Sequence, residues 1–123
     1  MYHPVLLEQV ANPYHMAAMD CADGVGQIGF PGEGPFLIFY VRLSEEGLIE
    51  NASFETYGCP SAIGCGSWLC RWVEGKKTKE ILSITPDELM VAVGGLPLGK
   101  ERAAQLAIGA LRYAIEDSFE AAG

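Results

Sequence analysis

Among the four cysteines of this 123-residue chain, Cys59 has the sequence context most typical of a reactive thiol. It lies between Gly58, which permits backbone angles closed to other residues, and Pro60, which favours the first turn of a helix. We therefore predict that Cys59 is the N-cap of a helix. A thiolate there faces free backbone N–H groups and the positive end of the helix dipole, which favour its ionised form. This chemistry suits a nucleophile, a sulfur carrier or a metal ligand; the alternative is a small buried side chain at a strand–helix junction.

The other cysteines have weaker contexts. Cys65 and Cys70 lie in the helix that follows Cys59, about 140° apart around its axis, so they do not bind one ion together from that helix. Two interpretations of Cys65 stay open. It is either a core side chain or a second thiol beside Cys59, which accepts sulfur or acts as a resolving thiol. Cys21 falls in a loop-like region and, like Cys70, is given no role. No C-x-x-C pair occurs, so a zinc ribbon or thioredoxin motif is absent.

The pattern of apolar residues changes from strands to helices at Gly58. The segment FLIFYVRL is rich in β-branched and aromatic residues, and together with the next alternating segment it predicts an antiparallel hairpin. A long helix packed on one face is predicted near the end of the chain, because apolar residues recur there with helical spacing. The expected helices are 3–11, 60–74, 78–83, 85–93 and 100–120, and the expected strands are 36–43, 48–58 and a short one at 25–30.

Length and order of elements fix the predicted fold class. A chain of 123 residues fits one domain, 1–123, with a core of its own. Strands first and helices afterwards predict an α+β fold, in which a small antiparallel sheet of about three strands packs against helices.

Charge and motifs exclude several functions. Sixteen acidic residues against eight basic ones give a formal net charge of −8, which disfavours binding to nucleic acid or to an anionic membrane surface. The start of the chain has neither a basic region nor a long apolar run, so we expect a cytoplasmic protein with reduced thiols. No dinucleotide-binding, P-loop, serine-hydrolase or zinc-protease motif occurs, and we do not expect an enzyme.

With these elements in order, the sequence resembles the NifU/IscU family of iron–sulfur cluster assembly scaffolds along nearly its whole length. The segment around Cys59 carries the most specific match, because it follows the family pattern F-x-T-x-G-C-x-x-A-I-x-x-x-S. The fold implied is the one that NifU and SufE share. The matching segments are NPYHM (12–16), ADGVGQIGFPGEGPF (22–36), FETYGCPSAIGCGS (54–67), WVEGKKTKEI (72–81) and GLPLGKERAAQLA (95–107).

The resemblance also implies a ligand set, most of which this chain replaces. Glu33 stands where the family has its first cysteine, and Pro35 stands at the nearby aspartate. Arg102 stands at the histidine and Ala103 at the last cysteine, so that Cys59 alone is kept. The site implied is therefore Cys59 with Glu33 as metal ligands, with Cys65 as a further residue that binds the cofactor. That cofactor would be iron or an iron–sulfur cluster, with zinc as another candidate ion.

Three functions follow from the resemblance. The first is a divergent cluster assembly protein that binds iron or a cluster, or accepts sulfur, at Cys59. The second is a persulfide carrier similar to SufE, which needs no metal and in which Arg102 favours the bound persulfide by its charge. The third is a non-catalytic protein that binds a cysteine desulfurase. The resemblance implies a cysteine desulfurase as partner in each case, with acceptor apo-proteins as further partners.

Overall fold

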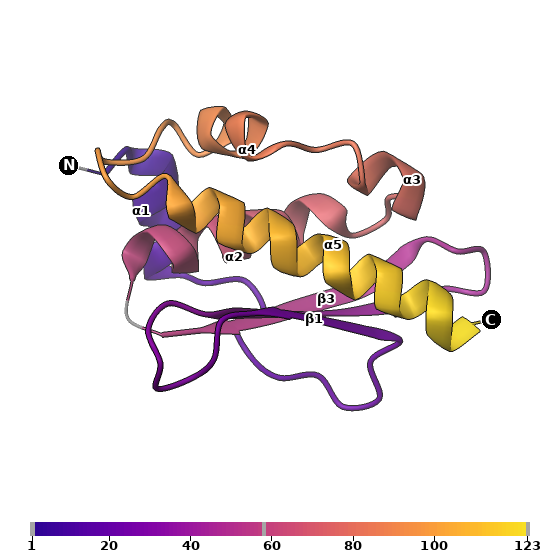
Figure 1. The fold of residues 1–123 in the computed structure, drawn as a ribbon. Helices are drawn as coiled ribbons and strands as arrows, with labels where there is room; N and C mark the ends of the chain where they lie inside the picture. Colours follow the sequence, from indigo (N-terminus) through magenta and orange to yellow (C-terminus); the bar gives the residue numbers. More distant parts are fainter. Residues whose placement is uncertain (1, 58, 123) are drawn as a thin grey trace.

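The computed structural model describes residues 2–57 and 59–122 and contains one three-stranded antiparallel sheet in the order β1-β2-β3. The helices lie on one side of this sheet, and long loops run below it (Figure 1). The predicted α+β fold is thereby confirmed. The elements are α1 (Pro4–Ala11), β1 (Gly24–Ile28), β2 (Leu37–Leu43), β3 (Ile49–Thr56), α2 (Pro60–Val73), α3 (Thr78–Ile81), α4 (Pro86–Ala92) and α5 (Arg102–Ala122).

The central strand β2 places alternate side chains in the core. Leu37, Phe39 and Val41 are fully buried, whereas the residues between them are only partly covered. This is the period of two expected for a strand with one buried face. Phe39 is paired with Phe54 of β3, as the predicted hairpin requires. The hairpin thus supplies the apolar face on which the helices pack.

Helix α5 lies directly on β1 because glycines face it there. A Cβ atom at Gly26 would be 2.0 Å from the carbonyl oxygen of Ala110, and one at Gly24 would be 2.0 Å from that of Ala114. Real Cβ atoms do not approach a backbone oxygen so closely, so only glycine permits this packing. The contact fixes the start of α5 beside the sheet end at which β3 leads into α2 (Figure 1).

A polar network ties the segment after α1 to α2 and β3. The Tyr14 hydroxyl donates to Oε1 of Glu74 at 2.5 Å, and Nδ1 of His15 lies 3.4 Å from Oε2 of the same carboxylate. The amide of Phe54 donates to the carbonyl of His15 at 3.1 Å. This segment therefore partly covers the outer edge of β3. The apolar core lies on the face of the sheet against which α2 and α5 pack.

The connection from α2 to α5 contains the two short helices that were predicted. Gly75, with φ of +84°, follows the end of α2 in the left-handed region that favours glycine. Thr85 is the N-cap of α4, and its hydroxyl accepts from the Glu88 amide at 3.2 Å in a capping box. The long helix begins at Arg102, two residues later than expected. None of the helices in the described part of the chain is both long enough and apolar enough to span a membrane.

Candidate functional site

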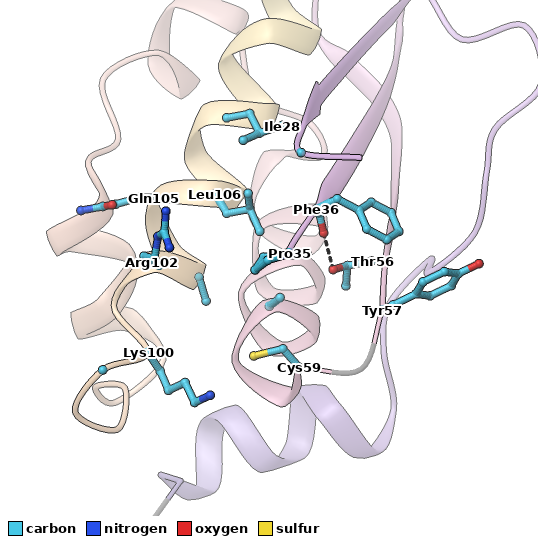
Figure 2. A pocket seen from close by; sticks show the side chains of 14 residues that line it. Ile28, Pro35, Phe36, Thr56, Tyr57, Cys59, Lys100, Arg102, Gln105 and Leu106 are labelled. Carbon is cyan, nitrogen blue, oxygen red and sulfur yellow. Dashed lines mark hydrogen bonds between the residues drawn. The ribbon is translucent and has the colours of Figure 1, made fainter. Parts of the chain in front are cut away.

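A cavity of about 590 Å³ lies where the N-terminal ends of α2 and α5 come close to the end of the sheet. Figure 2 shows side chains from both helices and from two strand ends pointing toward this space. Apolar groups make most of its wall, with a few polar groups among them. The lining residues are Ile28, Gly29, Pro35, Phe36, Thr56, Tyr57, Cys59, Ala62, Gly99, Lys100, Arg102, Ala103, Gln105 and Leu106.

Cys59 occupies the position predicted for it, the N-cap of α2. Its backbone is extended, with φ of −89° and ψ of 115°, and its carbonyl accepts the first helical hydrogen bond from the amide of Ile63 at 3.0 Å. The thiol makes no capping hydrogen bond and is half-buried. Figure 2 shows the sulfur pointing into the cavity. A 14-residue helix therefore directs the positive end of its dipole toward a thiol that a small molecule can reach.

The wall beside Cys59 is held in place by the ends of β2 and β3. The Thr56 hydroxyl is buried and donates to the carbonyl of Phe36 at 2.6 Å. The ring of Tyr57 meets that of Phe36 edge-on, with centroids 5.1 Å apart. Opposite them, Leu106 of α5 closes the cavity (Figure 2). The site thus has a firm apolar wall on two sides, and Tyr57 is exposed at its rim.

Among the described residues, the charged side chains that line the cavity are Lys100 and Arg102, and no carboxylate lines it. In Figure 2 the ammonium group of Lys100 extends toward the side on which Cys59 lies, whereas the guanidinium of Arg102 turns away from Cys59 and toward Gln105. Among the side chains of residues 2–57 and 59–119, neither of these two cations has an ion-pair partner. The sequence analysis singled out Arg102 and missed Lys100, whose place at the cavity depends on how α5 packs on the sheet and not on its neighbours in sequence.

Cys65 does not take part in this site. It is fully buried in the core, as is Cys70, and neither thiol lines the cavity. Burial, and to a smaller extent the charge of Cys59, raise the pKa of the Cys65 thiol to about 12. Burial and the Glu74 carboxylate raise the pKa of Cys70 as well. Of the two interpretations of Cys65 left open by the sequence, the structure favours the core side chain.

The other residues predicted from the ligand set are only partly brought together. Pro35 and Ala103 line the cavity beside Cys59. Glu33 is exposed in the loop between β1 and β2 and is not among the lining residues, which does not favour its pairing with Cys59. Loop placement depends on turn geometry, which the alignment of motifs does not report.

Metal-binding side chains are sparse around the cavity. In the part of the chain that the structure describes, no group of three or more His, Cys, Asp or Glu side chains is arranged to hold a metal ion. Iron–sulfur clusters are held mainly by cysteine thiolates, and Cys59 is the single thiol in the lining. The described residues of this chain alone therefore do not fit a cluster, which would need donors from another molecule.

Known proteins resemble this chain in sequence over most of its length, and solved structures resemble it in fold. Residues 1–122 match the family described as NifU-like N terminal domain. The chain is 37% identical to the iron–sulfur cluster assembly scaffold protein IscU 1 of Archaeoglobus fulgidus, over all of this chain and 80% of that protein. It is 34% identical to the scaffold protein IscU of Aquifex aeolicus, over 94% of this chain and 74% of that protein. The crystal structure of a NifU-like N-terminal protein from Brucella abortus has a TM-score of 0.72 at 18% identity, and the match covers 96% of this chain and 94% of that one.

Proposed function

Because the chain belongs to the family of NifU-like N-terminal domains, we propose that it is an iron–sulfur cluster assembly protein that receives sulfur on Cys59. One observation carries the choice of residue: the Cys59 sulfur points into an open cavity at the N-terminus of α2. The relatives named as cluster assembly scaffolds support the process in which the protein acts.

The sulfur donor is the persulfide of a cysteine desulfurase. The Cys59 thiolate attacks the outer sulfur of the donor persulfide, a new S–S bond forms at Cys59, and the donor cysteine leaves as a thiolate with the electron pair of the broken S–S bond. No external oxidant or reductant is needed. The positive end of the α2 dipole and the Lys100 ammonium lie at the cavity into which the anionic donor persulfide enters.

Iron and the finished cluster are cargo that the protein carries during cluster assembly. Since Cys59 is the single thiol in the lining, we propose that the other ligands of a nascent cluster come from a partner protein, a second copy of the chain or a small thiol. Glu33 and Cys65 are left out of the proposed site, one because it does not line the cavity and the other because it is buried.

Delivery of a cluster to an acceptor tests this function. The protein is incubated anaerobically with ferrous iron, cysteine, a cysteine desulfurase and an apo-ferredoxin, and the absorbance of the holo-ferredoxin is followed. We expect the wild type to accelerate its formation, Cys59→Ser to abolish the acceleration, and Cys21→Ser, which changes an exposed thiol outside the cavity, to retain it. A wild-type protein that leaves the rate unchanged would contradict the proposal.

A further inference from the structure

The cavity beside Cys59 has the size of a small-molecule site. Its volume of about 590 Å³ lies within the range of roughly 300–1,000 Å³ that is usual for small-molecule sites. Its walls are mainly apolar, and Cys59 lies in the lining rather than at a flat surface (Figure 2). This space can hold a small molecule against the thiol.

The charge of the lining is opposite to that of the chain. Acidic residues outnumber basic ones by sixteen to eight in the whole sequence, whereas the described part of the lining contains two cationic side chains and no carboxylate. The ammonium of Lys100 lies on the same side of the cavity as the Cys59 sulfur (Figure 2). An anion next to a nucleophilic sulfur is the ligand that such a lining favours.

We propose that the Cys59 cavity accepts sulfur directly from a small anionic sulfane-sulfur donor, whose anionic end pairs with Lys100. This inference rests on the part of the proposed function in which Cys59 carries sulfur, but it does not require a desulfurase. Inorganic thiosulfate and the persulfide of a carboxylate-bearing small thiol share this chemistry. The apolar wall made by Ile28 and Leu106 accommodates the carbon chain of the organic donor.

The transfer is balanced for both donors. With thiosulfate, the Cys59 thiolate attacks the sulfane sulfur, the S–S bond of thiosulfate breaks, and sulfite leaves with its electron pair. With an organic persulfide, the outer sulfur moves to Cys59 and the small thiol leaves as a thiolate. In each case the product is the Cys59 persulfide. Lys100 pairs with the charge on the donor and on the leaving group.

The test uses the reduced full chain without any desulfurase, incubated separately with thiosulfate and with glutathione persulfide. Mass spectrometry of the intact protein and of its peptides locates each added sulfur atom, and released sulfite is measured in the thiosulfate arm. We expect sulfur to add to Cys59 faster than to the exposed Cys21, which serves as an internal control. Lys100→Glu should slow the addition about tenfold, since it reverses one charge on the side of the cavity on which the thiol lies. Lys79→Glu, the same change on exposed α3, should leave the rate unchanged.

Each outcome either supports the proposed small anionic donor or contradicts it. Addition from thiosulfate alone, or from the organic persulfide alone, supports the inference and identifies the donor. Equal rates for Cys59 and Cys21, or for wild type and Lys100→Glu, would overturn it. No addition from either donor would also overturn it; if a cysteine desulfurase still loads Cys59 in a parallel reaction, the proposed function stands, and if it does not, both fail.

Discussion

Replacing Cys65 with alanine should make the protein less stable near neutral pH and more stable at alkaline pH. Burial, helped by the charge of Cys59, raises the pKa of Cys65 from 9.0 to about 12. The folded protein therefore keeps this thiol protonated, while the unfolded chain ionises it above pH 9. The stabilisation linked to the thiol is complete below pH 9 and is lost as the pH rises from 9 to 12.

The magnitude follows from the size of this window. One pH unit within it costs about 1.4 kcal/mol, so at pH 10.5, which is 1.5 units above 9.0, the loss is about 2 kcal/mol. Removing a buried sulfur costs about 1 kcal/mol at every pH, as for one buried methylene-sized group. We therefore expect Cys65→Ala to be about 1 kcal/mol less stable than wild type at pH 8 and about 1 kcal/mol more stable at pH 10.5.

Urea unfolding followed by circular dichroism at both pH values measures this difference. The other groups with raised pKa values, such as Tyr40, are present in both proteins, so their effect cancels in the comparison. Cys21→Ala, which removes an exposed thiol, is the matched control for loss of a cysteine. A difference between wild type and Cys65→Ala that stays the same at pH 8 and pH 10.5 would refute the assignment of Cys65 to the dry core.

Three further predictions test the packing and the site. Gly26→Ala should lower the free energy of unfolding by about 1–3 kcal/mol in urea titrations, because the new Cβ would lie 2.0 Å from the Ala110 oxygen and α5 must shift; an unchanged midpoint would contradict the close packing. Thr85→Ala should cost about 1 kcal/mol in the same assay through loss of the α4 capping box, and no loss would mean that this cap does not contribute to stability. At pH 8, iodoacetamide should modify Cys59 and Cys21 in the folded protein and the two buried cysteines only in urea, as peptide mass spectrometry reports; rapid modification of a buried cysteine would argue against the core described above.

The sequence predicts the elements that local patterns determine. Helix α2 begins where Cys59 and Pro60 indicate, and the two strands before it pair as the alternating segments suggest. Turn and cap residues explain this success, because Pro and Thr at helix starts act within a few residues of the chain. Strand β1 was predicted from 25 to 30 and runs instead from Gly24 to Ile28, because the chain turns at Gly29, whose φ of +77° lies outside the strand region.

The candidate site was predicted less completely, because long-range packing decides which side chains meet. Cys59 was identified from its neighbours in sequence, and its N-cap position is confirmed. Helical spacing alone left Cys65 open to two roles, and only burial separates them. Lys100 lines the cavity because α5 packs on β1. Nothing in its own sequence neighbourhood indicates that it lies at the same cavity as Cys59. Glu33 was expected near Cys59 from the motif order, but the loop that carries it projects into solvent.

The most direct test of sulfur transfer to Cys59 is to locate the sulfur after reaction with a cysteine desulfurase and cysteine under anaerobic, iron-free conditions. Peptide mass spectrometry of the wild type should find one added sulfur atom on Cys59 and none on the two buried cysteines. Cys59→Ser should carry no added sulfur, and Cys21→Ser should carry as much as wild type. Added sulfur on Cys59→Ser, or a wild-type protein that gains none, would contradict the account.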